Sequence, residues 1–398
     1  MKNILFICNK SPWPPKEGGP IAMNNLIEGL SDAGCNIKVL AVNTNKYSVK
    51  RDEIPESYRR KTGIEFQYID LSVKPLPAFF NLFTNKSYHV QRFISKNFEK
   101  LLINTLKSNK FDIVQIETLF MSPYMETIRK YSGAKIVLRA HNIEHLIWKR
   151  LWQTEKNPLK KLYLKHLYKT LERYETGILD SYDGIVSITA KDALFFKKHS
   201  NTPVVSISFG IDTEKLKPFI KPPVEHALFH IGAMNWMPNQ EGIKWFLDNV
   251  WKDVLSEVPG AKLHLAGREM PAWLTSLNRK NVHVAGEVDN AYQFISRYTV
   301  SVAPLLSGSG IRIKIIESMA MGKAVISTSI GAEGIEYENG KNIIIADTPH
   351  EFASAVKKLL TDRKYCDYIG KNASKLISEK HVNKNLILDL LAFYDKIL

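Results

Sequence analysis

The sequence predicts an α/β protein with two Rossmann-like domains that face each other across a cleft. Two observations support this fold class. Short apolar segments rich in β-branched residues alternate with longer amphipathic segments, a pattern typical of doubly wound parallel sheets. The chain also has 398 residues, more than one hydrophobic core usually serves, and the proline-rich stretch at residues 217–223 resembles a linker in composition.

The predicted domain boundaries follow from this alternation. We expect a first domain at residues 1–212, a linker at 213–225, a second domain at 226–375 and a terminal amphipathic helix at 376–398. In the first domain the predicted strands are residues 2–7, 37–42, 111–117, 134–139, 183–189 and 204–208, and the predicted helices are 20–32, 77–107, 122–131, 144–180 and 189–199. In the second domain the predicted strands are residues 226–231, 261–266, 282–287, 300–304 and 324–328, and the predicted helices are 241–254, 290–298 and 313–321. Residues 43–75 are polar and charged and receive no predicted element.

The composition limits the class of protein. The apolar fraction of 44% and the charged fraction of 24% are those of an ordinary globular protein. No apolar run approaches the ~20 residues of a membrane span, and the amino terminus lacks the pattern of a secretory signal. The three cysteines are widely separated, which fits a reducing compartment and shows no metal-ligand spacing. We therefore expect a cytoplasmic protein.

The most informative stretch is a glycine-rich turn, residues 307–310, between a predicted strand and a predicted helix. Backbone N–H groups at such a turn and the positive end of the helix dipole together form an anion site. Lys314 on the first turn of the helix adds a positive charge, and Glu317 follows one turn later on the same face. A ligand with phosphates and hydroxyl groups, such as a nucleotide sugar, fits this combination. The alternative is an ordinary strand–turn–helix connection with a solvated Lys–Glu pair.

Several residues of this stretch carry a family resemblance. They are Pro304-Leu305, Gly308-Ser309-Gly310, Arg312-x-Lys314, Glu317-x-x-Ala320 and the segment from Gly322 to Thr328. Together they resemble the donor-site signature of GT-B glycosyltransferases of family 4, in the subgroup with the motif G-S-G-x-R-x-K. The resemblance implies a retaining enzyme that takes its sugar from a nucleotide diphosphate, and a terminal helix that packs back on the first domain.

The resemblance also assigns roles to residues. Glu317 matches the glutamate that holds the donor ribose, whereas the first glutamate of the family motif falls on Ser309 and leaves the donor sugar undefined. The diphosphate is expected on the glycine loop and the basic residues, which are Gly308, Ser309, Gly310, Ile311, Arg312 and Lys314. Arg312 has a structural ion pair as its alternative role. Gly232 and the segment 234–242 are expected to line the phosphate side of the cleft, and Gly286 with Glu287 to hold the base through backbone groups.

The first half of the chain offers two candidate features. The sequence G-x-G-x-x-G is absent after the first predicted strand, which argues against a dehydrogenase; Gly18 and Gly19 open the next helix instead. By resemblance this glycine pair lies across the cleft from the donor, near the acceptor. His141 follows a predicted strand end, where ligands bind in parallel sheets, and relatives carry a histidine there that contacts the transferred sugar. We expect it to position the sugar; a purely structural histidine is the alternative.

The formal charge of +15 calls for an anionic partner. No helix-turn-helix, RNP or zinc-finger pattern is present, so we expect no nucleic acid partner. Residues 144–180 form a strongly basic predicted helix with interleaved aromatic residues, which predicts peripheral binding to an anionic membrane face. A solvated basic face over a buried aromatic stripe explains the same pattern.

The sequence therefore predicts a glycosyltransferase that moves a sugar from a nucleotide sugar to a glycan or lipid-linked acceptor. Its donor is a substrate, and neither a cofactor nor a metal ion is expected, because no Asp-x-Asp triad is present. Cell-surface polysaccharide synthesis, including lipopolysaccharide, is the setting that the resemblance implies. The alternatives are a nucleotide-sugar 2-epimerase of the same fold and a non-catalytic basic protein that binds lipid-linked anions.

Overall fold

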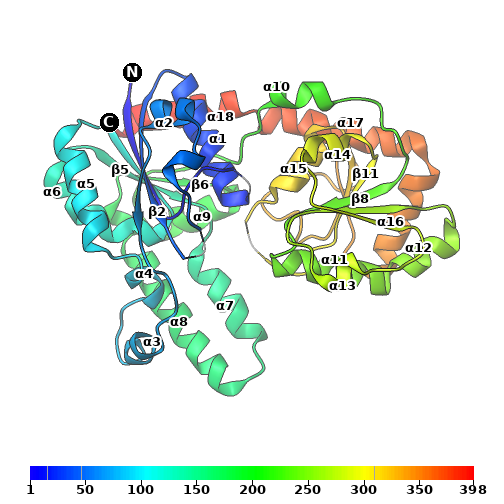
Figure 1. The fold of residues 1–398 in the computed structure, drawn as a ribbon, viewed down its shortest axis with the longest axis horizontal. Coiled ribbons are helices and arrows are strands. Elements are labelled where there is room, and N and C mark those ends of the chain that lie inside the picture. The colour runs from blue at the N-terminus through cyan, green and yellow to red at the C-terminus, as the bar shows by residue number, and fades with distance from the viewer. Residues whose placement is uncertain (16, 46, 309) are drawn as a thin grey trace. The chain divides into compact units, whose positions relative to one another are not determined.

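The chain folds into two compact units, and its last residues return to the first of them. The computed structural model describes residues 1–15, 17–45, 47–308 and 310–398 (Figure 1). The first unit comprises Met1–Ser208 and Lys384–Leu398, and the second comprises Phe209–Asn383. Most of the predicted linker at 213–225 is ordered within the second unit, where α10 (Thr213–Leu216) forms a helical turn.

The first unit is built on a parallel sheet of seven strands in the order β3-β2-β1-β4-β5-β6-β7. The strands are β1 (Asn3–Cys8), β2 (Asn36–Asn43), β3 (Glu65–Tyr68), β4 (Ile113–Glu117), β5 (Lys135–Ala140), β6 (Gly184–Ser187) and β7 (Val204–Ser206). The helices are α1 (Gly18–Asp32), α2 (Glu56–Thr62), α3 (Pro75–Asn81), α4 (Tyr88–Gln91), α5 (Lys96–Ser108), α6 (Met125–Tyr131), α7 (Glu144–Thr154), α8 (Pro158–Gly177), α9 (Ala190–His199) and α18 (Asn383–Ile397).

The second unit is built on a parallel sheet of six strands in the order β10-β9-β8-β11-β12-β13. The strands are β8 (Leu228–Ile231), β9 (Leu263–Ala266), β10 (Val282–Gly286), β11 (Val300–Ala303), β12 (Ala324–Ser327) and β13 (Ile344–Ile345). Besides α10, the helices are α11 (Met237–Asn249), α12 (Trp251–Glu257), α13 (Ala272–Thr275), α14 (Ala291–Ser296), α15 (Ile313–Ala320), α16 (Pro349–Thr361) and α17 (Arg363–Lys380). The predicted α/β class with two Rossmann-like units is confirmed.

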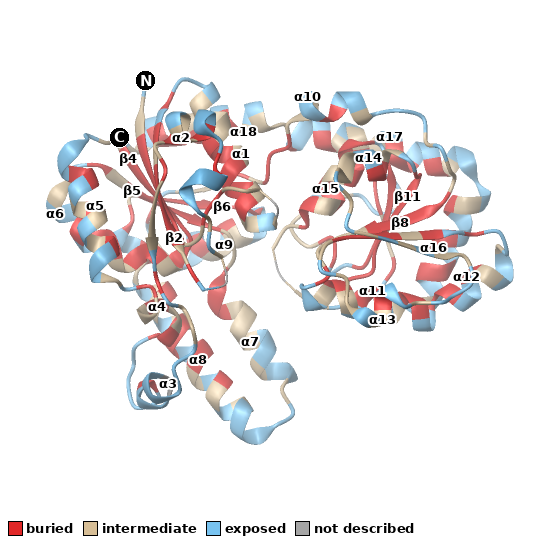
Figure 2. Ribbon diagram, in the orientation of Figure 1, coloured by how far each residue is buried: buried red, intermediate tan, exposed pale blue. Residues whose placement is uncertain are grey.

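Central strands are almost entirely buried because helices cover both faces of each sheet. All four residues of β11 and of β12 are buried, as are the last five of β1, and Figure 2 shows these strands in red between paler helices. Edge strands are less buried: β3, with the sequence EFQY, has no buried residue. That mixed composition explains why residues 43–75, which hold β3 and α2, gave no sequence signal.

The terminal helix α18 packs on the sheet of the first unit. Tyr394 is fully buried and its hydroxyl donates a hydrogen bond to the side chain of Gln115 on β4. Gly184 on β6 leaves room for Phe393, since a Cβ at this glycine would lie 2.9 Å from the phenylalanine ring. The return of the terminal helix, implied by the resemblance, is confirmed by these contacts.

Three helical predictions need correction. The predicted helix at 77–107 is divided into α3, α4 and α5, with turns and irregular backbone at residues 82–87 and 92–95. Residues 144–180 form a hairpin of two helices, because Asn157 accepts hydrogen bonds from the Leu159 and Lys160 N–H groups and caps α8 while Pro158 occupies its first turn. Helical periodicity places Ser318 and Met321 on the same side as the half-buried Lys314, opposite the apolar face of α15, but both residues are buried. The reason is the neighbouring α17, whose Ser374 hydroxyl bonds to the carbonyl oxygen of Ala320.

Within the described residues, no helix is both long enough and apolar enough to cross a bilayer.

Candidate active site

The glycine loop between β11 and α15 has a backbone that side chains disfavour. Gly308 has a φ of 111° and Gly310 a φ of 77°, both in the left-handed region. A Cβ on Gly308 would also lie 2.9 Å from the guanidinium of Arg312 and 3.0 Å from the ring of Trp236. Ile311 and Arg312 follow, and α15 starts at Ile313, so the loop leads directly into the positive end of a helix. Ser309 lies outside the described residues.

Arg312 belongs to the turn, as predicted, and it is the N-cap residue of α15. Its side chain is only 5% exposed. One guanidinium N–H donates to the carbonyl oxygen of Gly310, and the guanidinium lies 5.2 Å from the centre of the Trp236 ring. Arg312 therefore stabilises the glycine loop through a hydrogen bond to its backbone and places a positive charge next to it.

Lys314 is held between two polar side chains, one from α11 and one from β8. Its Nζ donates to Oδ1 of Asn239 at 2.6 Å and lies 3.5 Å from Nε2 of His230. His230 donates its Nδ1–H to the carbonyl oxygen of Val302 at 2.8 Å, which leaves Nε2 as an acceptor. Burial, and then the charge of Lys314, depress the pKa of His230 well below its ordinary value, so this ring is neutral.

The environment of Lys314 makes its charge sensitive to ligands. Burial, with a further contribution from the charge of Arg312, lowers the pKa of Lys314 to about 7. An anion bound beside Nζ would favour the charged ammonium and raise this pKa again. A bound anion would therefore stabilise the charged form of Lys314.

Glu317 lies one turn further along α15. The hydroxyl of Tyr292, on α14, donates to its Oε1 at 3.0 Å. Burial raises the pKa of Glu317 to about 7, and the Tyr292 hydrogen bond opposes the shift. Since a carboxylate has two oxygens, the second can accept hydrogen bonds from a ligand.

The remaining predicted residues of the second unit lie at the carboxyl ends of other strands. Gly232 follows β8, and a Cβ there would lie 2.8 Å from Nδ2 of Asn239, so its lack of a side chain lets Asn239 reach Lys314. Gly286 ends β10 with a φ of 73°, and the exposed Glu287 comes next. Because β9 and β8 separate β10 from β11, three strand spacings of about 4.8 Å place this end roughly 14 Å from β11. The predicted base-binding turn and the glycine loop therefore lie on the same edge of one sheet but are not in contact.

In the first unit, His141 is anchored by a buried carboxylate. Its Nε2 lies 2.6 Å from Oε2 of Glu117, at the end of β4. Burial acts to raise the pKa of Glu117, but the charge of Arg139 and the His141 hydrogen bond outweigh it, so this carboxylate is ionised. Burial depresses the pKa of His141 in turn. The neutral ring therefore donates Nε2–H to Glu117 and keeps Nδ1 as an acceptor.

Gly18 and Gly19 lie at the same edge of the first sheet. They begin α1, directly after the loop that follows β1, and β4 separates β1 from β5. A Cβ on Gly19 would lie 2.9 Å from the side-chain nitrogen of Lys10, and the charge of Lys10 also depresses the pKa of His141. The glycine pair, Lys10 and His141 are thus neighbours, although 122 residues separate Gly19 from His141.

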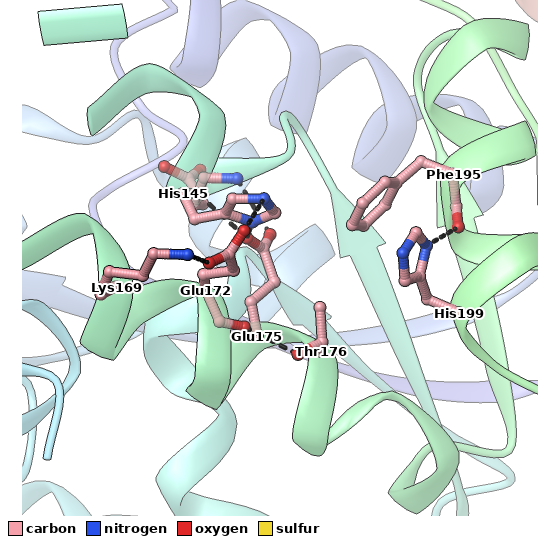
Figure 3. A network of polar contacts seen from close by, with 8 residues as sticks. His145, Lys169, Glu172, Glu175, Thr176, Phe195 and His199 are labelled. Atoms are coloured by element: carbon pink, nitrogen blue, oxygen red, sulfur yellow. Dashed lines mark hydrogen bonds and ion pairs between the residues drawn. The ribbon is translucent and has the colours of Figure 1, made fainter. Parts of the chain in front are cut away.

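A second buried carboxylate fixes the helix that follows His141. Glu175 of α8 accepts hydrogen bonds from the backbone N–H groups of Glu144 and His145 at 2.9 and 3.0 Å, and from the His145 ring at 2.6 Å. Figure 3 shows Glu175 and Glu172 of α8 converging on His145. The first turn of α7 is therefore tied to α8, and the His141 loop is held between two anchored points.

Comparisons with known proteins show what the chain is similar to. Residues 225–362 match the family model described as glycosyl transferases group 1. Residues 225–362 are a group 1 glycosyltransferase domain. Over 403 residues the chain is 23% identical to an uncharacterized 44.6 kDa protein in the cps region of Klebsiella pneumoniae, covering 97% of this chain and 98% of that protein.

Solved structures extend the likeness to the whole chain. Sucrose-phosphate synthase of Thermosynechococcus elongatus superposes with a TM-score of 0.73 at 14% identity, covering 100% of this chain and 99% of that one. Anabaena HepE in complex with UDP superposes with a TM-score of 0.68 at 12% identity, covering both chains completely. The chain thus has the GT-B fold, and the expectation of this fold is confirmed. The expected glycosyltransferase class is confirmed by the family match at residues 225–362.

Several residues that contact the predicted ones, in the first or the second unit, escaped sequence analysis. They are Lys10, Glu117, His230 and Tyr292. Each supports a predicted residue from a distant part of the chain. Glu117 is the last residue of β4 and His230 the third of the four residues of β8, so a charged or polar side chain near the end of a buried strand was the available signal.

The tight approach of α11 to the loop after β11 gives a testable stability effect. A Cβ on Gly242, within α11, would lie 2.3 Å from the carbonyl oxygen of Pro304. Gly242→Ala is therefore expected to destabilise the glycosyltransferase by about 1–3 kcal/mol, although alanine is the better helix former. Chemical denaturation measures the change. Gly177→Ala is the control, since Gly177 ends α8 and has nothing within 4 Å of the added Cβ. Equal stability of the two variants would show that α11 does not make this contact.

Proposed function

We propose that this glycosyltransferase moves a sugar from a nucleotide diphosphate to a glycan or lipid-linked acceptor, with retention and without a metal ion. We further propose that it acts in cell-surface polysaccharide synthesis. The observation that carries the proposal is the arrangement of Gly308, Gly310, Lys314 and Glu317 along one loop and one helix face. It offers an anion site and a carboxylate one helical turn apart.

In this proposal the diphosphate binds the glycine loop and the start of α15. Backbone N–H groups of the first helical turn point toward the ligand, and Lys314 takes on full positive charge as the diphosphate approaches. When the bond between sugar and diphosphate breaks, negative charge grows on the leaving oxygen. Lys314 and Arg312 stabilise that charge in the role that a divalent cation has in metal-dependent enzymes.

The nucleoside is proposed to run along the carboxyl edge of the second sheet. The free oxygen of Glu317 accepts hydrogen bonds from ribose hydroxyls, while Tyr292 keeps the carboxylate in place. The base is proposed to bind the turn at Gly286 and Glu287, which lies farther along the same edge. HepE, whose structure contains UDP, supports a nucleotide ligand for this fold.

The acceptor is proposed to bind the carboxyl edge of the first sheet, where Gly18, Gly19 and His141 gather. Nδ1 of His141 is the hydrogen-bond acceptor that this edge offers to a sugar hydroxyl, because Glu117 occupies Nε2. The relative encoded in a cps region supports the assignment to polysaccharide synthesis.

A screen of nucleotide sugars with a set of glycan acceptors tests the proposal. We expect release of a nucleoside diphosphate that depends on both substrates, a product with the donor's anomeric configuration by NMR, and no loss of rate with EDTA. An epimerised sugar formed from donor alone would identify a 2-epimerase. Binding of lipid-linked anions with no turnover of any donor would identify a binding protein.

A further inference from the structure

The helix α3 carries an apolar face that no other part of the described chain covers. Leu76, Phe79, Phe80 and Phe83 stand at positions i, i+3, i+4 and i+7, which places them on one side of the helix and its following turn. The three phenylalanines are 55%, 64% and 77% exposed, and the Phe79 ring lies 5.9 and 5.5 Å from those of Phe80 and Phe83. Exposed clusters of this kind mark interaction sites.

The opposite side of α3 and its following turn is docked on α8. Asn81 is buried and lies 3.4 Å from the ring of His166, and Asn85 accepts a hydrogen bond from Arg173 at 2.9 Å. Tyr88 packs with Leu164 and Leu167 of α8 in a small apolar cluster. Polar contacts thus hold α3 with its apolar face turned outward, beside the hairpin of α7 and α8 (Figure 1).

The surface continues onto α8. Leu159 and Leu162 are 80% and 67% exposed, and Leu162 precedes His166 by one helical turn. The two exposed leucines therefore lie on the same side of α8 as the residues that contact α3, nearer to the end of the hairpin. We define the α3 face as Leu76, Phe79, Phe80, Phe83, Leu159 and Leu162.

Basic residues surround the α3 face, and acidic residues are scarce. Residues 71–92 contain no Asp or Glu, and residues 144–177 contain eight basic residues against four glutamates, of which Glu144 and Glu175 are buried. Lys86 and Lys165 are exposed, and no carboxylate of the described chain pairs with them. Core positions of protein interfaces are depleted in lysine, whereas exposed Phe and Leu ringed by lysines suit the headgroup layer of an anionic membrane.

We infer that the α3 face binds the surface of an anionic lipid bilayer, with its phenylalanines in the headgroup region and the surrounding lysines against lipid phosphates. The aromatic residues that the sequence suggested for this role do not supply the contact. Trp148, Trp152 and Tyr163 pack against the buried cluster of Tyr88, Leu164 and Leu167 inside the hairpin. The lipid contact comes instead from α3, which the sequence placed in a long helical region without a role.

Co-sedimentation with vesicles tests the inference, with no nucleotide sugar present, so its outcome is independent of glycosyl transfer. We expect the protein to bind vesicles of phosphatidylcholine mixed with phosphatidylglycerol, more weakly at high salt, and to leave pure phosphatidylcholine unbound. Phe80→Ser with Phe83→Ser is expected to lower the partition coefficient at least about tenfold. Leu194→Ser with Leu388→Ser is the control, because these leucines, on α9 and α18, are 69% and 56% exposed and should not alter binding.

The charge requirement has its own pair of variants. Lys86→Glu with Lys165→Glu is expected to lower partition at least about tenfold, while Lys364→Glu with Lys371→Glu, the same charge change in the second unit, leaves it unchanged. Circular dichroism confirms that each variant is folded. Equal binding to neutral vesicles, unchanged binding of Phe80→Ser with Phe83→Ser, or a dimer in solution that these two substitutions dissociate would each overturn the inference; the last would make the α3 face a protein interface.

Discussion

Replacing Lys314 with alanine is expected to lower the turnover of donor by about 10²- to 10³-fold, as loss of a charge-stabilising group at a reacting centre does. The Nζ of Lys314 is held by Asn239 and faces a neutral His230, so its charge has no carboxylate partner among the described residues. A bound diphosphate would be that partner. Steady-state release of nucleoside diphosphate measures the effect.

Two further variants sharpen this prediction. Lys244→Ala is the matched control, since Lys244 is exposed on α11 and paired with Asp248, and we expect its rate to be unchanged. Because the pKa of Lys314 is about 7, its charged fraction in the free enzyme falls as pH rises, so wild-type donor affinity should weaken from pH 6 to 8 through this group. Lys314→Arg stays charged and should lose that alkaline decline. Full turnover by Lys314→Ala would remove the lysine from the mechanism.

Glu317→Ala is expected to weaken nucleoside diphosphate binding by about 10- to 100-fold, the loss of one or two hydrogen bonds to a charged acceptor. Isothermal titration calorimetry measures the change, and the choice of ligand makes it specific. Pyrophosphate has no ribose, so its affinity should fall in Lys314→Ala but not in Glu317→Ala. Since burial raises the pKa of Glu317 to about 7, the carboxylate form grows with pH and its contribution should strengthen between pH 6 and 8.

Tyr292→Phe gives an intermediate control for Glu317. It removes the hydroxyl that holds Oε1 but leaves the carboxylate, so we expect a smaller loss of nucleotide affinity than in Glu317→Ala. If Glu317→Ala weakened pyrophosphate and nucleotide equally, the carboxylate would act through the shape of the loop and not through the ribose.

Local patterns were sufficient to propose the centre of the candidate site. The buried strand β11, the glycines and the helical spacing of Lys314 and Glu317 are all encoded within 18 consecutive residues, from Val300 to Glu317. The contacts that escaped prediction are non-local. Asn239 and His230 reach Lys314 across 75 and 84 residues of sequence, and Glu117 reaches His141 across 24 residues. Such pairs form only when parallel strands bring their carboxyl ends to one edge.

The basic region at 144–180 shows a different limit of sequence reasoning. Its charge and aromatic content were visible, but the cap at Asn157 turns it into a hairpin whose aromatic residues face inward. Which apolar residues stay exposed depends on how α3 docks on α8, through Asn81 and Asn85, and neither asparagine belongs to a recognisable motif.

A crystal structure of the enzyme with a bound nucleoside diphosphate tests the proposed donor site most directly. We expect phosphate oxygens against the backbone N–H groups at Gly308–Gly310 and the first turn of α15, Nζ of Lys314 within hydrogen-bond distance of a phosphate, and both ribose hydroxyls on Glu317. A nucleotide bound elsewhere would contradict this expectation. So would a glycine loop whose N–H groups all donate hydrogen bonds to the protein itself in an enzyme that still turns over donor.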